Sequence, residues 1–232
     1  MKAERVLVIA AHPDDEVLGC GGTIARFRDA NAPVRVVFLA EGITARYDPP
    51  EFETPKVKAE SAARNANAVK ALALLGVERE AVFLAERPCC RLDQVPLIDL
   101  VKEVEGHIRE FRPSQLLTHW GQDTNIDHCL AHRAVLAATR PIAIPYLRRI
   151  LAFEVLSSSE WNTTTAFPAN AFHDITGQID RKLEAMAAYG DEMRQPPHPR
   201  SAQVIRGLAS FRGAQAGVPY AEGFSLIRSL EA

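Results

Sequence analysis

The sequence predicts one α/β domain built on a largely parallel sheet. Apolar segments alternate with amphipathic ones along the chain, which is typical of repeated strand–helix units. The chain has 232 residues, 47% of them hydrophobic, so it can bury a large core without disulfides or structural metals. Because no internal repeat or low-complexity linker divides it, we expect a single domain over residues 1–232, less regular from about residue 155.

The elements of the first part follow from their patterns. The first strand is uniformly apolar, so we place it inside the sheet. A small-residue turn from Gly19 to Gly22 leads into a helix with Ile24 and Phe27 on one face. Polar, proline-bearing residues 43–55 predict a loop. The predicted strands are 5–11, 33–42, 80–86 and 114–120, and the predicted helices are 20–31, 56–77, 95–113 and 128–141.

The second part has weaker periodicity. Residues 148–159 predict a strand that runs into a serine turn, and a helix is expected from about Gln178. The proline-rich stretch 194–203 predicts a loop before another helix at 201–215, and residues 220–230 predict a final strand.

The composition excludes several classes of protein. Lys and Arg total 27 and Asp and Glu total 29, a formal net charge of -2, so the totals give no basic face for nucleic acid. No apolar segment reaches the roughly 18 residues of a membrane span, and the apolar N-terminal stretch is too short for a signal peptide. The four cysteines lack the paired spacing of a structural zinc site. We therefore expect reduced thiols and a cytoplasmic location.

Polar side chains gather where the predicted strands end. In parallel sheets, ligands bind at the carboxyl ends of the strands, so groups from distant segments should meet at one rim. The polar residues after the first strand are His12, Asp14, Asp15 and Glu16. Those at and after the strand 114–120 are His119, Asp123, Asn125, Asp127 and His128.

His12 and Asp15 are three residues apart on a tight turn. With one distant histidine they would offer two nitrogens and one carboxylate oxygen, and leave a position for water, as in catalytic zinc sites. Iron, cobalt and manganese accept such ligands too. A carboxylate beside the metal takes a proton from that water, and Asp14 and Asp15 can divide the two roles. A solvated helix N-terminus would explain the carboxylates, but not His12 at the end of a core strand.

The segment "AHPDDEVLGCGGTIAR", residues 11–26, resembles the signature of the PIG-L, or LmbE-like, de-N-acetylase family. A second family element, H-P-D-H, corresponds to "NIDH" at residues 125–128, and C-terminal stretches look like the branch associated with bacterial surface glycoconjugates. The resemblance implies a Rossmann-like three-layer αβα sandwich with a mainly parallel sheet, and homo-oligomers are frequent in this family. It also implies Zn2+, or Fe2+ as proposed for some members, held by His12, Asp15 and His128, with Asp14 as general base.

The sequence departs from the family at Asn125, where members carry a histidine that stabilises the oxyanion or protonates the leaving amine. An amide can donate a hydrogen bond to an oxyanion but cannot deliver a proton. His119, His132 and His198 are candidates for the missing acid. We expect His119 to be catalytic because it ends a strand on the rim. A strand-end histidine bonded to backbone is the alternative.

Further side chains are expected around the metal and the substrate. Asp123 and Asp127 can orient the ligand imidazoles, as carboxylates behind metal ligands commonly do. Trp120 and Trp161 can stack on a sugar ring, although burial is the commoner fate of tryptophan. The candidates for substrate binding are Arg46, Arg64, His198 and Arg200, with solvated surface residues as the alternative.

Together these features predict a metal-dependent hydrolase that removes the acetyl group of an N-acetylated sugar or glycoconjugate and releases acetate and a free amine. Asp14, His119 and Asn125 are the expected catalytic residues. No nucleic acid partner and no membrane span are expected. Two alternatives stay open. Asn125 favours a catalytically impaired metal- or sugar-binding member, and the same site can serve an amidase or deformylase on a non-sugar N-acyl substrate.

Overall fold

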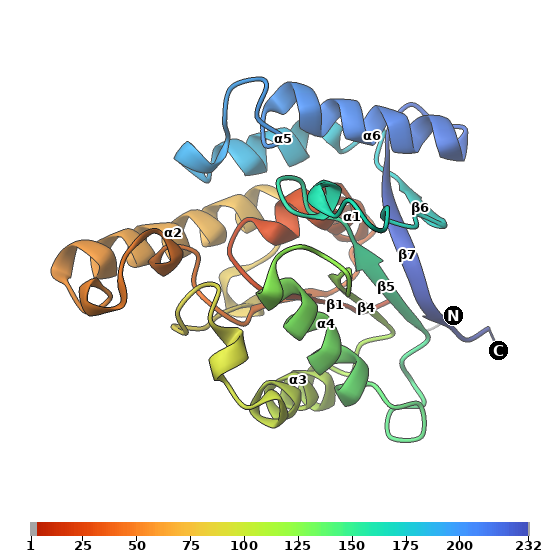
Figure 1. Ribbon diagram of the computed structural model, residues 1–232. Coiled ribbons are helices and arrows are strands. Elements are labelled where there is room, and N and C mark those ends of the chain that lie inside the picture. Colours follow the sequence, from red (N-terminus) through yellow and green to blue (C-terminus); the bar gives the residue numbers. More distant parts are fainter. Residues whose placement is uncertain (1–3, 232) are drawn as a thin grey trace.

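The computed structural model describes residues 4–231, and a seven-stranded sheet runs through its middle (Figure 1). The strand order is β3-β2-β1-β4-β5-β7-β6. The first five of these strands are parallel, whereas β7 runs antiparallel to both of its neighbours. The strands are β1 (Val6–Ala10), β2 (Val34–Phe38), β3 (Val82–Leu84), β4 (Gln115–His119), β5 (Arg149–Phe153), β6 (Ala171–Asp174) and β7 (Ala221–Ser229).

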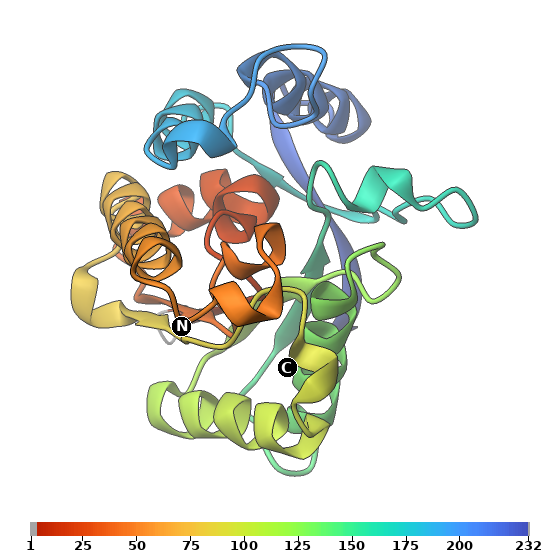
Figure 2. The same ribbon diagram turned by 60° about the vertical axis from the view of Figure 1, so that its left-hand side comes forward.

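Helices cover both faces of the sheet, which confirms the predicted αβα sandwich (Figures 1 and 2). One face carries α1 (Asp15–Asp29), α2 (Pro55–Leu74), α5 (Ile179–Ala187) and α6 (Ala202–Ala216). The other face carries α3 (Leu97–Phe111) and α4 (Ile126–Ala138). The expected single domain over residues 1–232 includes a few terminal residues outside the described range and stays a prediction.

The first strand explains why both faces need helices. Val6 and Val8 point into the core under α1 and α2, and Leu7 and Ile9 point into the core under α3 and α4. Successive side chains of a strand alternate between faces, so an uninterrupted apolar run must be buried on both. All five residues of β1 are buried, as the sequence predicts for an interior strand.

One expectation about local structure is wrong, and one strand was not predicted. Residues 19–22 form no turn but lie within α1, where glycine is needed for close packing. A Cβ atom at Gly19 would lie 2.3 Å from Phe153, and one at Gly22 would lie 2.8 Å from Ile175. The sequence patterns also do not predict β6, because a strand of 4 residues at the edge of the sheet shows little alternation.

A buried carboxylate joins α1 to β7. Glu222 of β7 accepts hydrogen bonds from the backbone N–H groups of Gly22 at 2.9 Å and Thr23 at 2.7 Å. Lys182 of α5 donates to the same side chain at 2.6 Å. The helix is interrupted just before these donors, since Cys20 has a non-helical φ of -149°. Glu222 therefore satisfies helical N–H groups next to the kink.

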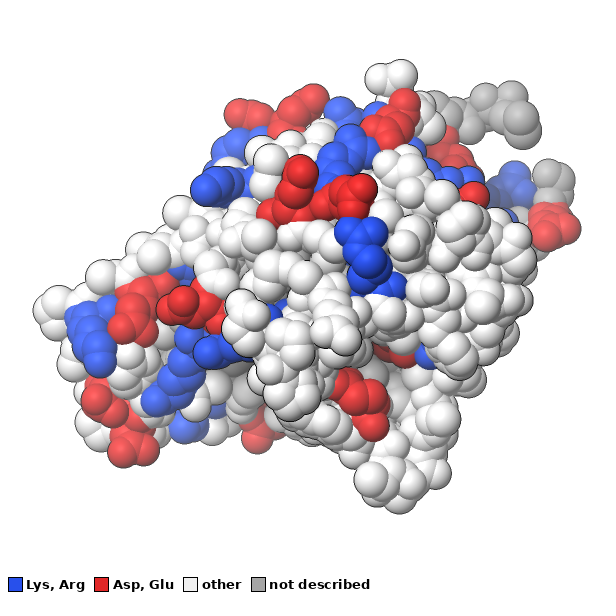
Figure 3. Space-filling model, turned by 90° about the horizontal axis from the view of Figure 1, so that it is seen from above, with Lys and Arg blue, Asp and Glu red and all other residues white. Residues whose placement is uncertain are grey.

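The charged surface is mixed. Seen from above, Lys and Arg lie interspersed with Asp and Glu, and no large field of one sign covers that face (Figure 3). Among residues 4–231, no helix combines the length and the apolar character that crossing a bilayer requires.

Candidate active site

The candidate site lies where the sheet reverses its winding. β1 and β4 are central neighbours, but the helices that follow them, α1 and α4, cover opposite faces. The crevice at the carboxyl ends of such strands is the usual ligand position in α/β sheets. The turn after β1 carries His12 and Asp15, and the first turn of α4 carries His128. The topology thus brings together segments more than a hundred residues apart.

Three buried side chains bring their ligand atoms together here. Nδ1 of His12 and Nε2 of His128 each lie 3.3 Å from Oδ2 of Asp15. The three ligand atoms lie within 4.8 Å of one another. Within residues 4–231, the buried Nε2 of His128 has no hydrogen-bond partner, which is costly unless a cation satisfies it. Two imidazole nitrogens and one carboxylate oxygen fit zinc with an open coordination position, and they also suit iron.

Carboxylates behind the two imidazoles select the nitrogen that faces the centre. Oδ2 of Asp127 lies 2.9 Å from Nε2 of His12. Because an ionised carboxylate only accepts, Nε2–H donates to Asp127, and Nδ1 is the nitrogen that faces Asp15 and would bind a metal once its proton is displaced. Oδ1 of Asp123 lies 3.2 Å from Nδ1 of His128, within ion-pair distance, and places a negative charge behind that ring as well. Both rings are therefore oriented as metal ligands require.

The charges of this cluster depend on one another. Burial lowers the pKa of His12, but Asp127 and Asp15 outweigh burial and raise the pKa to about 10. Burial also lowers the pKa of His128, and Asp15 and Asp123 raise it to about 9. Burial disfavours the charged form of Asp15, yet the neighbouring histidines hold its pKa well below the usual value. A cation must displace the imidazole protons, so its affinity falls as the pH falls.

Asp14 lies next to the cluster on strained backbone. Its φ of 124° is a region that costs a non-glycine residue about 1–3 kcal/mol. Its Oδ2 accepts hydrogen bonds from Arg64 and Arg200, both at 2.8 Å. Burial raises the pKa of Asp14, against the opposing effect of Arg200 and Arg64. A fixed carboxylate with a raised pKa is suited to accept a proton from water.

These groups line an open cavity of about 510 Å³. Asn125 lines it at the start of α4, where its Oδ1 accepts a hydrogen bond from the backbone N–H of Asp127 at 2.9 Å. Its Nδ2 donates to Sγ of Cys90 at 3.8 Å, so the second N–H of this amide is the donor that remains for a ligand. Trp161 and Ile126 also line the cavity, although they are 57% and 49% exposed. The cavity thus combines buried polar groups with accessible apolar surface, as ligand sites commonly do.

Comparison with known proteins gives the family. The PIG-L profile, described as GlcNAc-PI de-N-acetylase, matches residues 7–139, more than half of the chain. The chain belongs to the PIG-L family. The matched range includes His12, Asp15 and His128, which we call the ion cluster because together they could hold a metal ion, and the family resemblance of the sequence motifs is confirmed.

The curated relatives of this PIG-L protein are named as deacetylases. It is 29% identical over 210 residues, 79% of this chain and 67% of the relative, to a 1D-myo-inositol 2-acetamido-2-deoxy-alpha-D-glucopyranoside deacetylase of Tsukamurella paurometabola. A relative of the same name from Thermobispora bispora is 30% identical over 164 residues, 62% of this chain and 54% of the relative. This chain thus spans about half the length of some relatives. A Bacillus anthracis protein described as "Probable N-acetyl-alpha-D-glucosaminyl L-malate deacetylase 2" is 26% identical over 201 residues, 83% of each chain.

Solved structures share the fold of the PIG-L protein. The N,N'-diacetylchitobiose deacetylase from Pyrococcus horikoshii has a TM-score of 0.76 and 24% identity, over 98% of this chain and 85% of that one. GalB from Pseudomonas putida, a 4-carboxy-2-hydroxymuconate hydratase, has a TM-score of 0.73 and 21% identity, over 99% of this chain and 98% of that one. Since a deacetylase and a hydratase share this fold, the chemistry must be argued from the site.

The structure does not support the expected role of His119. Its Nε2 accepts a hydrogen bond from the backbone N–H of Ala11 at 2.8 Å, and its ring stacks on His128 with centroids 3.9 Å apart. The ring is completely buried and does not line the cavity. Burial, together with the nearby charge of His128, holds the pKa of His119 well below its usual value. His119 is therefore a strand-end histidine bonded to the backbone, which was the alternative to a catalytic role. Its ring packs against the ring of His128.

Other predicted residues divide into two groups. Arg46, Arg64 and Arg200 line the cavity, and their role in substrate binding stays a prediction. His198 does not: its Nδ1 accepts a hydrogen bond from the backbone N–H of Arg200 at 3.1 Å, so it shapes the loop that carries this arginine. Trp120 is buried and packs edge-on against Phe167, which leaves Trp161 as the tryptophan available to a ligand.

Glu192 and Cys90 are among the cavity residues that the sequence did not predict. Glu192, after α5, pairs with Arg46 and accepts from Arg64 and Arg200, each at 2.7 Å. No sequence motif marks it, and only the folded chain shows a buried acid facing three arginines. Cys90 lines the cavity beside Cys89. The adjacent cysteines were visible in the sequence, but their spacing argued only against a structural zinc site.

Proposed function

We propose that this protein is a metal-dependent N-deacetylase that hydrolyses the acetamide of an N-acetylated sugar or glycoconjugate. The observation that carries the proposal is the convergence of His12, Asp15 and His128 beside the strained Asp14 in one cavity. The names of the PIG-L relatives support the choice of an acetamidosugar over another amide. The same fold in a hydratase keeps a non-sugar substrate as the competing candidate.

His12, Asp15 and His128 would hold the metal, and Zn2+ is the ion we propose, with Fe2+ as the alternative. When bound, the metal supplies Lewis-acid polarisation of the amide carbonyl and of water. Asp127 and Asp123 keep the two imidazoles in the tautomers that present a lone pair to it. The carboxylate of Asp15 anchors the turn as well, because its Oδ2 accepts the backbone N–H of His12 at 2.8 Å.

Asp14 is the residue that moves the proton. Both contacting guanidiniums reach Oδ2, so within the described residues Oδ1 is left to face water in the cavity. Asp14 takes a proton from that water as it attacks the acetamide carbon. It then returns the proton to the amide nitrogen, the C–N bond breaks, and acetate and the amine are released. This use of one carboxylate in both directions needs no separate histidine acid, which fits Asn125 and the buried His119.

Asn125 stabilises the developing oxyanion. Its Oδ1 accepts from Asp127 at the start of α4 and one N–H of Nδ2 donates to Sγ of Cys90, so the amide is held in place and its second N–H is oriented before the reaction begins. A preorganised donor of this kind is worth about 2.7–4 kcal/mol in known oxyanion holes. The family histidine is thereby replaced as a donor but not as an acid.

The cavity side chains favour a sugar that also carries an anionic group or an aglycone. The Trp161 ring, 57% exposed, offers a flat apolar face for a sugar ring or its aglycone. All three cavity arginines pair with Asp14 or Glu192, and Arg46, whose side chain is 45% exposed, is the most accessible of them and therefore the best placed to meet an anionic group. A cytoplasmic location and a homo-oligomeric state complete the proposal.

The test is a panel of N-acetylated sugars, read out as free amine and acetate, with chelated protein as the blank. Release of acetate that requires metal supports the proposal and excludes the catalytically impaired alternative. If no N-acetylated sugar releases acetate but a non-sugar N-acyl compound is hydrolysed, the sugar substrate is wrong and the protein is an amidase or deformylase.

The variant Asp14→Asn tests the proton transfer. It should lower turnover about 10²–10⁴-fold, the usual contribution of general acid–base catalysis, while metal content stays at the wild-type level. Asp191→Asn, an exposed change of the same charge, is the matched control and should keep wild-type turnover. Wild-type turnover in Asp14→Asn would refute the assignment.

A further inference from the structure

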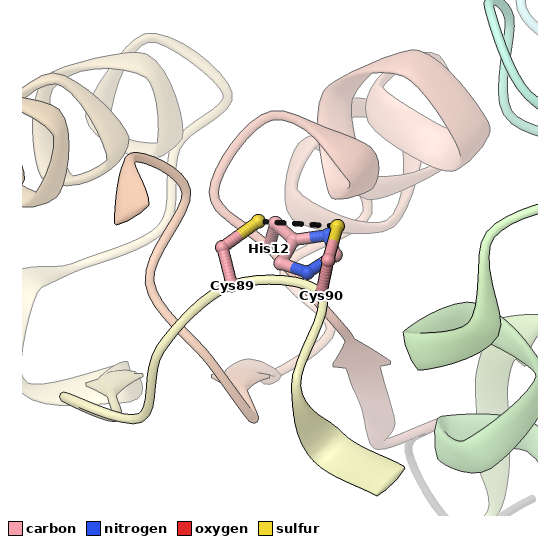
Figure 4. A group of neighbouring side chains, drawn as sticks. All are labelled: His12, Cys89 and Cys90. Atoms are coloured by element: carbon pink, nitrogen blue, oxygen red, sulfur yellow. Dashed lines mark hydrogen bonds between the residues drawn. The ribbon is translucent and has the colours of Figure 1, made fainter. Parts of the chain in front are cut away.

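Two adjacent thiols lie at the cavity. Cys89 is buried and Cys90 is exposed, and both line the cavity wall. Their sulfur atoms are 3.7 Å apart, and both point to the same side of the loop, next to the ring of His12 (Figure 4). The left-handed φ of 57° at Cys90 turns its side chain to the side of Cys89 instead of alternating away from it. Neither thiol has a role in the proposed hydrolysis.

Two buried carboxylates hold the loop that carries these thiols in place. The backbone N–H of Cys89 donates to Oε1 of Glu41 at 2.9 Å, and that of Cys90 donates to Oδ2 of Asp127 at 2.7 Å. The N–H of Leu92 donates to the other oxygen of Asp127 at 2.9 Å. Buried carboxylates that accept several backbone N–H groups fix a loop strongly. The two sulfurs are therefore preorganised, which lowers the entropy that a ligand must overcome.

The spacing of the sulfurs matches chelation. Two thiolates bound to one tetrahedral zinc at 2.3 Å are about 3.8 Å apart, which is the edge of the tetrahedron. A disulfide would require the sulfurs to approach to about 2.05 Å. One nitrogen of His12 and the two sulfurs lie within 4.8 Å of one another, so an imidazole is available as third ligand.

We propose that Cys89, Cys90 and His12 form a second, thiolate-based metal site that binds soft divalent cations such as Cd2+, or Zn2+ in excess. Two metal–sulfur bonds form, and the two thiol protons pass to solvent without any redox change. Thiolates select soft cations and leave Mg2+ to oxygen ligands. His12 belongs to both clusters, so a cation on the thiols competes with the ion at Asp15 and His128. Occupation of this site therefore blocks the cavity and inhibits the enzyme.

The first experiment follows Cd2+ binding to metal-free protein by the ultraviolet charge-transfer absorption of Cd–thiolate bonds. We expect the wild-type protein to develop this absorption. We also expect Cd2+ to protect two of its thiols from reaction with a thiol reagent. Cys90→Ser and Cys89→Ser should each lose most of the absorption. Cys129→Ser is the matched control, because its thiol donates to the carbonyl of Asp123 outside the cavity wall, and it should retain the absorption.

Equal absorption in Cys90→Ser, or its loss in Cys129→Ser, would overturn the site. Cys90 is exposed, so its serine variant is expected to fold, and the thermal unfolding of each variant checks this. Mg2+ in place of Cd2+ should produce no absorption and protect no thiol, and protection by Mg2+ would also contradict the proposal.

The second experiment tests the competition for His12. Protein loaded with Co2+ has a d–d spectrum that reports its ligands, and Cd2+ should change that spectrum in the wild type but not in Cys90→Ser. An unchanged Co2+ spectrum in the wild type, with the Cd–thiolate absorption present, would refute the shared ligand. The competition rests on the ion cluster of the proposed function. Both spectra are measured without substrate, so a failure of the deacetylase assay would leave this result independent.

Discussion

Asp127→Asn tests how the ligand tautomer of His12 is set. Asp127 accepts three buried donors: Nε2–H of His12 at 2.9 Å, and the backbone N–H groups of Cys90 at 2.7 Å and Leu92 at 2.9 Å. An asparagine has one carbonyl oxygen, and its NH2 group must face at least one of these donors. In either orientation of the amide, the negative charge behind the imidazole is lost.

The size of the effect follows from these contacts. Loss of a carboxylate behind a metal-bound histidine costs about 10–100-fold in metal affinity, or about 1.4–2.7 kcal/mol. The buried donor left without an acceptor costs a further 1–3 kcal/mol, roughly, in the free energy of unfolding of the metal-free protein. The two losses are separable, because the first requires the metal and the second does not.

The assay is a zinc titration of metal-free protein against a chromophoric chelator, combined with urea unfolding of the same samples. The exposed Asp191→Asn variant carries the same charge change and should bind zinc as the wild type does. Wild-type zinc affinity in Asp127→Asn would show that Asp127 does not set the ligand nitrogen of His12, and the tautomer reasoning would be wrong.

Three further predictions concern stability and substrate binding. Gly22→Ala should lower the free energy of unfolding in urea by about 1–3 kcal/mol, because its Cβ atom would lie 2.8 Å from Ile175. Gly106→Ala should raise the free energy of unfolding by about 0.5–1 kcal/mol, because no described atom lies within 4 Å of its Cβ position. Burial lowers the pKa of His173 to about 4. Between pH 6.5 and pH 4 the unfolded chain therefore binds a proton at this residue that the native protein does not bind. The free energy of unfolding falls as the pH falls through this range. His173→Gln should remove about 3 kcal/mol of that loss, and an unchanged difference in unfolding free energy between the two pH values would refute it. Trp161→Ala should raise KM about three- to tenfold for a ring-bearing substrate with little change in kcat, and a loss confined to kcat would contradict stacking in the bound state.

The sequence predicted those parts of the molecule that follow from local patterns. The continuous apolar run of β1 is buried on both faces, and the polar cluster that follows it lies at the carboxyl edge, as parallel sheets require. The pairing of His12 and Asp15 with His128 needed the family motif, because spacing alone does not choose among distant histidines. The elements missed were short or dictated by tertiary contacts. The sequence reads residues 19–22 as a turn because glycine is a poor helix former, but Gly19 and Gly22 lie within α1 because Phe153 and Ile175 pack too close to the helix for larger side chains there.

The surroundings of the ion cluster were harder to predict, because burial decides them. His119 and His128 are both histidines near strand or helix ends, but only the folded chain shows that a backbone N–H occupies Nε2 of His119. Glu192 is one of several acids in a loop segment, and its role depends on three arginines from other segments meeting it. Trp161 is exposed against the usual tendency of tryptophan.

The two halves of the site come from different parts of the chain, and this has an evolutionary consequence. The ion cluster falls inside the range matched by the family profile, residues 7–139, whereas Glu192, Arg200 and Trp161 come after it. Mutations in the later segments can therefore change which molecule is accepted while His12, Asp15 and His128 stay the same. Exchanging residues 155–201 between family members should therefore change their selectivity in part, because Arg46 stays in place, and it should also affect Asp14, which Arg200 contacts.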